Sequence, residues 1–245
     1  MSLMIPIFAL GLVLGLQHAM EADHVVAVAS LTRNNTSKKR ALLQGCAWGF
    51  GHSIALLTLV TLATFNGLSI SDEQTRWLEF AVGIMLIILG LKAIRVANRE
   101  RIQADSNMLV HNDIRRCMNK ARTEFTKYYP RRKILHKVLL PLLIGLVHGV
   151  AGSAALVILL AAASLSSHAQ ALLYVIVFGF GSIIGMVVLS LIFSLPVGFL
   201  KRQSILGLYT LSVGVGITAI CIGLHRCFYS NEILLLNSLI GLLSL

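Results

Sequence analysis

Charged residues are scarce in this chain. Asp, Glu, Lys and Arg make up 13% of its 245 residues, about half the roughly 25% that soluble domains carry. Apolar residues make up 56%, and the mean hydropathy is +0.81. So few charges cannot cover the surface of a soluble domain of this length. The composition therefore predicts an integral membrane protein whose main partner is the lipid bilayer.

Cysteines are also few, and they form no CxxC pair. This spacing excludes a disulfide framework, and we expect small apolar core residues. Acidic residues are outnumbered, ten against 21 Lys and Arg. A net charge of +11 can indicate nucleic-acid binding, but nearly all the basic residues lie between apolar stretches, as is typical of cytoplasmic loops. We therefore expect no nucleic-acid partner. The cysteines are Cys46, Cys117, Cys221 and Cys227.

Long apolar runs are what the chain has in abundance. A span needs about 20 apolar residues, and we expect the first to be a retained span because no Lys or Arg precedes it as in a secretory signal. Loops that contain Lys and Arg alternate along the chain with loops that lack them, which predicts that loop 98–136 is cytoplasmic and that both termini are outside. We expect the membrane to be a plasma (bacterial inner) membrane or an organellar membrane. Six stretches qualify: 4–30, 42–66, 77–97, 138–164, 170–196 and 205–226.

Three short motifs recur in the same order. GLQH at 15–18 returns as GLVH at 145–148, and GFG at 49–51 returns at 179–181, both by the same shift along the chain. VGIMLIILGL at 82–91 resembles VGITAICIGL at 215–224, by a slightly longer shift. Because each copy holds three spans, an odd number, the second copy enters the membrane from the opposite side. We predict an all-α integral membrane fold with six transmembrane helices in a 3+3 inverted-topology repeat. Its parts are residues 1–97 (first repeat), 98–136 (basic loop), 137–227 (second repeat) and 228–245 (apolar tail).

The first expected span contains the polar motif HAMEADH. Its four ionisable residues are His18, Glu21, Asp23 and His24. Each ionisable side chain within a span costs a few kcal/mol by insertion scales. Such a group is expected to face a cavity and bind an ion; the alternative is a hydrogen-bonded polar cluster between helices.

Helical spacing limits how this motif could bind one ion. In a regular helix His18, Glu21 and His24 form one stripe, and Asp23 points about 160° from Glu21. The two histidines then lie about 9 Å apart along the axis, whereas metal–nitrogen bonds are about 2.0–2.1 Å long. Either the helix is unwound here, or one member, such as Asp23, orients a ligand instead of binding the ion.

Two further histidines lie within expected spans. His52 follows the close-packing residues Gly49 and Gly51, and His148 is the repeat partner of His18. Imidazole with carboxylate suits Ni²⁺, Co²⁺, Zn²⁺ or Cu²⁺ better than Mg²⁺ or Ca²⁺. The expected site is asymmetric, because the second copy replaces Glu21, Asp23 and His24 by Ala151, Ser153 and Ala154. Histidines at loops or span ends are expected to be ordinary surface or interface residues: His111, His136, His168 and His225.

HAMEADH fits the HX4DH signature of the nickel/cobalt transporter family, and GFGHSI resembles that family's LGHS-type motif. GLVHGVAGSAALVILL resembles the UreH-like branch, named for urease accessory membrane proteins. The resemblance implies transport of Ni²⁺ or Co²⁺. It implies His18, Asp23 and His24 from the first motif and His52 with Ser53 from the second as site residues, and we add Ser153 as a supporting residue. Unlike high-affinity uptake members, this chain has no Asp or Glu in its last three expected spans.

We therefore predict a transporter of divalent transition-metal ions, not an enzyme. The expected site residues are His18, Glu21, Asp23, His24, His52 and His148. The metal is the transported ion, and no permanently bound cofactor is expected. Two alternatives remain: a non-transporting membrane subunit for metal delivery or complex assembly, and a metal-dependent membrane enzyme. A homo-oligomer, a metallochaperone and an accessory subunit remain open as partners.

Overall fold

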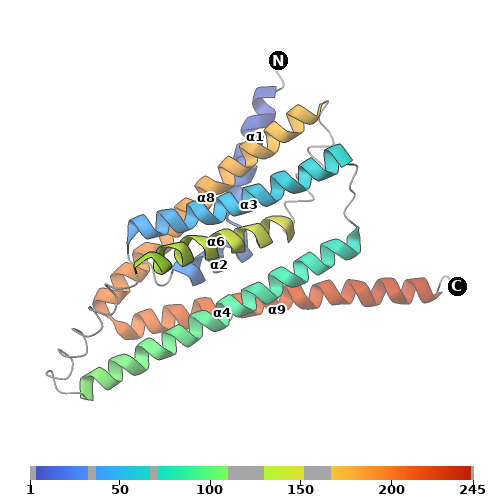
Figure 1. The fold of residues 1–245 in the computed structure, drawn as a ribbon. Helices are drawn as coiled ribbons and strands as arrows, with labels where there is room; N and C mark the ends of the chain where they lie inside the picture. The colour runs from blue at the N-terminus through green and yellow to red at the C-terminus, as the bar shows by residue number, and fades with distance from the viewer. Residues whose placement is uncertain (1–3, 33–36, 67–70, 110–129, 152–166, 244–245) are drawn as a thin grey trace.

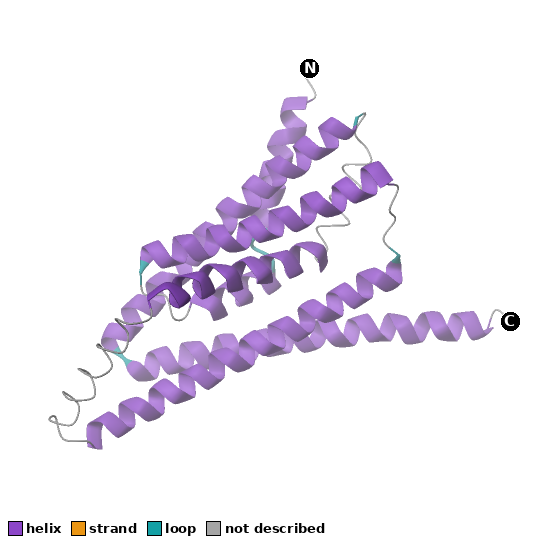
Figure 2. Ribbon diagram, in the orientation of Figure 1, coloured by secondary structure: helices purple, strands orange, loops and turns teal. Residues whose placement is uncertain are grey.

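The computed structural model describes residues 4–32, 37–66, 71–109, 130–151 and 167–243, and every regular element among them is a helix (Figures 1 and 2). The predicted all-α class is confirmed. In chain order the helices are α1 (Met4–His18), α2 (Ala22–Thr32), α3 (Lys38–Asn66), α4 (Asp72–Leu109), α6 (Pro130–Ala151), α8 (His168–Gln203) and α9 (Ile205–Leu243).

Four helices are long and apolar enough to cross a membrane: α3, α4, α8 and α9. They overlap the expected spans 42–66, 77–97, 170–196 and 205–226. The expected span 4–30 is divided between the shorter apolar helices α1 and α2. α6 covers the first part of the expected span 138–164, and residues 152–164 lie outside the described residues. The chain is therefore an all-α membrane protein.

The first expected span is broken at the polar motif. α1 ends at His18 and α2 begins at Ala22. Between them the backbone N–H groups of Met20 and Glu21 donate to the carbonyls three residues earlier, at 2.9 and 3.1 Å, as in the tightened last turn of many helices. Asp23 then lies in the first turn of α2, where the helix dipole favours a negative charge. The unwound helix, the first of the two alternatives for this motif, is observed.

Three helix ends lie beyond the expected boundaries. α4 continues to Leu109 and α6 begins at Pro130, so both ends of the basic segment 98–136 are helical. No Gly or Pro interrupts residues 98–109, which explains why the helix continues past the apolar run. α9 continues to Leu243, so residues 228–243 extend this helix. With 39 residues, α9 is roughly 58 Å long, well beyond the roughly 30 Å hydrocarbon core.

Glycines let the helices approach each other closely. In Figure 1, α1 lies along α8, and α4 pairs with α9 over most of its length. α3 packs against both α6 and α8. A Cβ on Gly45 or Gly49 of α3 would lie 2.7 Å from a Cα atom of α8, closer than real Cβ atoms approach. Small residues at these crossings are what membrane helix interfaces require.

The glycine contacts come in pairs: for each contact between two residues, their counterparts in the other half of the chain make a similar contact. Gly15 of α1 abuts the carbonyl of Phe178 on α8, and Gly145 of α6 abuts the carbonyl of Trp48 on α3. The shift that takes Gly15 to Gly145 also takes Trp48 to Phe178. The same exchange relates Gly181–Leu12 to Gly51–Leu142 and, by the slightly longer shift, Gly83–Gly223 to Gly216–Gly90.

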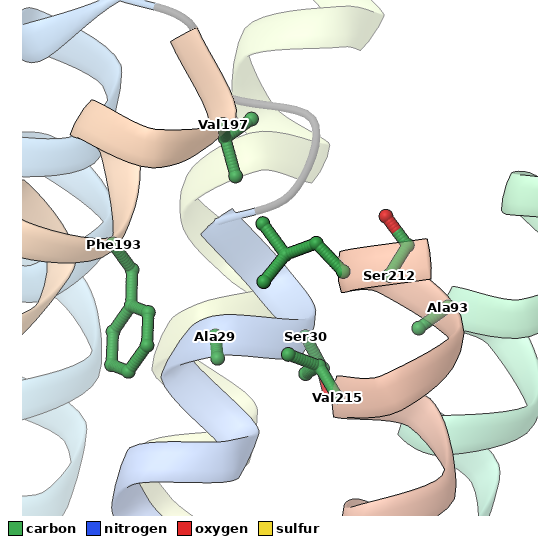
Figure 3. A pocket seen from close by; sticks show the side chains of 8 residues that line it. Ala29, Ser30, Ala93, Phe193, Val197, Ser212 and Val215 are labelled. Carbon is green, nitrogen blue, oxygen red and sulfur yellow. The ribbon is translucent and has the colours of Figure 1, made fainter. Parts of the chain in front are cut away.

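A small cavity lies beside the C-terminal part of α2 (Figure 3). Its volume is about 20 Å³, which is room for about one water molecule. Ser30 of α2 and Ser212 of α9 are its polar lining residues; the others are Ala29, Ala93, Phe193, Val197, Leu211 and Val215. The cavity at this end of α2 is therefore small.

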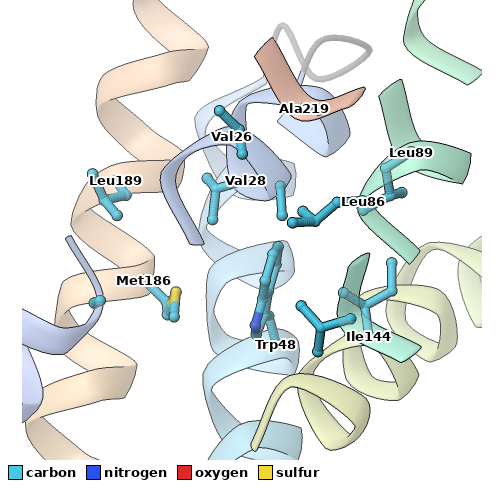
Figure 4. Close-up of a cluster of buried hydrophobic side chains, with 12 residues drawn as sticks. Val26, Val28, Trp48, Leu86, Leu89, Ile144, Met186, Leu189 and Ala219 are labelled. Carbon is cyan, nitrogen blue, oxygen red and sulfur yellow. The ribbon is translucent and has the colours of Figure 1, made fainter. Parts of the chain in front are cut away.

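The apolar core surrounds α2 (Figure 4). Val26 and Val28 of α2 pack in one buried cluster with Trp48 of α3, Leu86 of α4 and Met186 of α8. α2 has only 11 residues, too few to cross a bilayer alone. Its position therefore depends on the longer helices around it, which hold the break next to α3.

We predict that Gly145→Ala destabilises the helix bundle, because the added Cβ would clash with the Trp48 carbonyl. The expected cost is about 1–3 kcal/mol, seen as a lower thermal midpoint of the purified protein in detergent. Gly214→Ala is the matched control, since a Cβ there meets nothing within 4 Å and alanine favours the helix. Equal midpoints for the two variants would contradict this packing.

Candidate metal centre

Three buried histidines meet at the break in the first span. The ring centroids of His18 and His24 are 4.5 Å apart, and that of His52 on α3 lies 5.1 Å from the first and 5.3 Å from the second. One ring nitrogen from each lies within 4.8 Å of the others. The unwound turn therefore brings together two imidazoles that a regular helix would hold about 9 Å apart.

Carboxylates orient two of these rings. His18 Nδ1 donates to Glu21 Oε1 at 2.8 Å, and His24 Nδ1 donates to Asp23 Oδ1 at 3.1 Å. A carboxylate on one nitrogen fixes the ring and makes the other nitrogen a better ligand. The Nε2 atoms of both rings, and both nitrogens of His52, are buried without a hydrogen-bond partner within the described part of the chain. Leaving such atoms unpaired costs about 1–3 kcal/mol each, and a bound metal ion would satisfy one nitrogen of each ring.

His148 of α6 adjoins this cluster. Its ring centroid is 4.4 Å from that of His24, and its Nε2 lies 3.5 Å from Asp23 Oδ2. Asp23, His24 and His148 form a second group that could hold an ion, and it shares His24 with the first. Two adjoining ligand groups with a common imidazole could hold an ion in either of two neighbouring positions.

Asp23 connects the histidines to α9. Its Oδ1 accepts from the backbone N–H of His24 at 2.9 Å and from the His24 ring. Its Oδ2 accepts from Arg226 Nη2 at 3.0 Å, and Arg226 Nη1 lies 3.6 Å from Glu79 Oε1. Asp23 thus orients a histidine, as the second alternative for the motif proposed, while it also belongs to one of the ligand groups.

Aromatic rings enclose the histidines. Trp48 lies 6.3 Å from His24 and 5.7 Å from His148, and Phe178 lies 5.6 Å from His18, centroid to centroid. The shift along the chain that takes His18 to His148 also takes Trp48 to Phe178. These rings cover part of the histidine cluster with apolar surface, and electrostatic interactions are stronger where a site is shielded from water.

The expected supporting residues act mainly through helix packing. The Ser53 hydroxyl donates to the carbonyl of Gly49 at 2.8 Å and to that of Gly179 at 3.1 Å, which links α3 to α8. Gly51 lets α3 approach the Leu142 carbonyl of α6. Ser153 lies outside the described residues.

An open pocket of about 640 Å³ leads to one side of the cluster. Sequence reasoning missed Glu79 and Arg226 as site residues, and it expected His225, which lines the pocket, to be an ordinary surface or interface residue. A signal was present, because Glu79 is a carboxylate within the expected span 77–97, and intramembrane acids need a partner. The lining residues are Glu21, Ala22, Asp23, Glu79, Cys221, Ile222, His225 and Arg226.

Comparison with known proteins gives one informative relative. Urease accessory protein UreH from Bacillus sp. (strain TB-90) is 32% identical to this chain over 200 residues, which cover 82% of this chain and 81% of that protein. No family model matches the chain. No solved structure matches it.

We predict that Ni²⁺ or Co²⁺ quenches the fluorescence of Trp48, because this ring lies against His24 and His148. Trp77, the other tryptophan, is 61% exposed on α4. The variant Trp77→Phe should keep the metal-dependent quenching. Trp48→Phe should lose it while elemental analysis still finds bound metal. The reverse pattern would place the ion elsewhere.

Proposed function

The chain belongs to the UreH-like branch of the nickel/cobalt transporter family, and from this premise we propose that it carries Ni²⁺ or Co²⁺ across a membrane. The observation that carries the proposal is the convergence of His18, His24 and His52, whose buried nitrogens have no hydrogen-bond partner within the described residues. Neutral imidazoles with nearby carboxylates favour divalent transition metals over Mg²⁺ and Ca²⁺. The ion is the cargo of this site, and the chain is not an enzyme.

The ion binds the Nε2 atoms of His18 and His24 and one nitrogen of His52. Three protein ligands leave a coordination position open for water or a further ligand, and transport requires that the ion can leave as well as bind. The ion can pass between this group and the adjoining group of Asp23, His24 and His148, because His24 belongs to both groups. Glu21 holds the His18 ring in place during this transfer.

The helices form six spans in a 3+3 inverted repeat. Support comes from the glycine contacts that exchange the two halves of the chain, as in the contact of Gly15 with Phe178 and its counterpart between Gly145 and Trp48. Transporters of this plan bind their cargo where the repeats meet and work by movement of one repeat against the other. His18 and His148, equivalent in the repeat, come from opposite halves and belong to these adjoining groups.

The pocket gives this conformation access from one side. It is lined by Glu79, near the start of α4, and by Arg226 of α9, both at the side that the distribution of Lys and Arg predicts to be outside the cell or organelle. At the other end of α2 the cavity beside Ser30 is only about 20 Å³. The conformation is therefore open outward and closed toward the basic segment 98–136, which is cytoplasmic.

A second candidate function follows from the relative's name. UreH is described as a urease accessory protein, which favours a non-transporting subunit that binds metal and delivers it to a partner. The histidine cluster suits either role, because both require reversible binding. Metal flux separates them, since a delivery subunit alone moves no ion across a bilayer.

We predict that the purified protein in liposomes admits Ni²⁺ or Co²⁺, and that His18→Ala and His52→Ala abolish the flux by removing ligands. Accumulation of metal inside the vesicles is the measurement. His168→Ala is the matched control and should transport normally, since His168 begins α8 beside Phe65, with their ring centroids 5.1 Å apart.

Normal flux in both ligand variants would refute the site. Metal binding by wild-type protein without flux would instead establish the delivery role.

A further inference from the structure

A cation that belongs to the chain itself reaches the edge of the metal centre. Arg226 Nη2 lies 3.0 Å from Asp23 Oδ2, and Asp23 is buried while the arginine side chain is 24% exposed. Guanidinium stays protonated in proteins at all ordinary pH values. A permanent positive charge therefore stands next to a site whose proposed cargo is also positive.

The arginine stands between the pocket and the histidines. Asp23 lines the pocket, and it also contacts His24 and His148. An ion that enters from the pocket meets Asp23 before it reaches the buried rings. It then finds that carboxylate already paired with a cation.

Arg226 has a second acceptor within reach. Its Nη1 lies 3.6 Å from Glu79 Oε1, and Glu79 lines the same pocket. The guanidinium can release Asp23 and keep a carboxylate partner, so its displacement does not leave an unpaired charge. The open pocket supplies the space for this movement.

We propose that Arg226 is an internal competitor for the metal site: it pairs with Asp23 when no ion is bound, and it moves to Glu79 as an ion arrives. This inference rests on the proposed metal-binding function and adds a determinant of affinity and release. Return of the guanidinium to Asp23 weakens the hold on the ion and promotes its transfer.

The positions that correspond to Arg226 and Glu79 in the other half of the chain carry no charge. By the longer repeat shift, the one that takes Gly83 to Gly216, Glu79 corresponds to Ser212 and Arg226 to Ala93. Both counterparts line the small cavity of Figure 3. The open pocket therefore has a charged pair at the positions where the small cavity has a hydroxyl and a methyl group. Competition by an internal cation thus acts on the side of the open pocket.

Titration of purified protein with Co²⁺ or Ni²⁺ tests the inference. Arg226→Gln removes the charge and keeps an amide near Asp23, and we expect metal binding about tenfold tighter or more, because a unit charge a few ångströms away is worth more than this factor at an effective dielectric constant near 20. Release should slow by a similar factor. Arg226→Lys keeps the charge and should stay much closer to wild type.

A second comparison removes the risk that Arg226→Gln misfolds with an unpaired carboxylate. Asp23→Asn and the double variant Asp23→Asn/Arg226→Gln both lack the Asp23 charge, and they differ only in the guanidinium. The double variant should bind metal about tenfold more tightly than Asp23→Asn. Equal or weaker binding in the double variant would overturn the inference and leave Arg226 as a structural partner of Asp23.

The outcomes distinguish the two proposals. Wild-type protein that binds no metal refutes the proposed function and the competitor together. Wild-type protein that binds and transports metal, with no tighter binding when the guanidinium is removed, refutes the competitor alone. Tighter binding and slower release without Arg226, with Arg226→Lys near wild type, establish it.

Discussion

The interruption of the first expected span at residues 19–21 is the constraint on which the site depends. A continuous helix would hold His18 and His24 about 9 Å apart along its axis, whereas the break brings their ring centroids to 4.5 Å. The break is also what makes the charges tolerable in a membrane. Asp23 begins the second half-helix and accepts the backbone N–H of His24, and Glu21 pairs with His18. Each carboxylate thus pairs with an imidazole of its own segment, and Asp23 also accepts from Arg226 of α9.

A short half-helix cannot cross a bilayer alone, and glycine contacts between the neighbouring helices fix the packing around it. α2 has 11 residues, so the surrounding helices fix its position. Gly145 sets α6 against the carbonyl of Trp48, and Gly51 sets α3 against that of Leu142. These close approaches place His52 and His148 within reach of the break. Glycines at the helix crossings thus allow the close packing that brings the histidine side chains of the site together.

The sequence was sufficient for the local part of this arrangement. Few charges and long apolar runs predicted an all-α membrane protein, and the spacing of HAMEADH predicted that a single ion requires an unwound turn or an orienting Asp23. The role of Arg226 was not predictable in this way, because it lies 203 residues from Asp23 and helical periodicity relates only near neighbours. The continuation of α9 to Leu243 was missed for another reason. The apolar run after Arg226 is short, and polar residues such as Asn231 and Glu232 separate it from the sixth expected span without ending the helix.

The backbone contacts of the two halves of the chain correspond to one another, but the polar side chains at corresponding positions differ. Gly15 and Gly145 make equivalent approaches, while Ser182 takes the place of His52, and Ala93 that of Arg226. An inverted repeat with identical ligands in both halves would hold an ion equally well in both of its conformations, and differential affinity is what allows an ion to bias a conformational equilibrium. In the proposed transporter, the histidines concentrated in the first half and the cation from the second half beside Asp23 would make the two conformations bind the ion unequally. The difference in side chains between halves with corresponding backbone contacts is therefore the feature that would let a bound ion change the side from which the site is accessible.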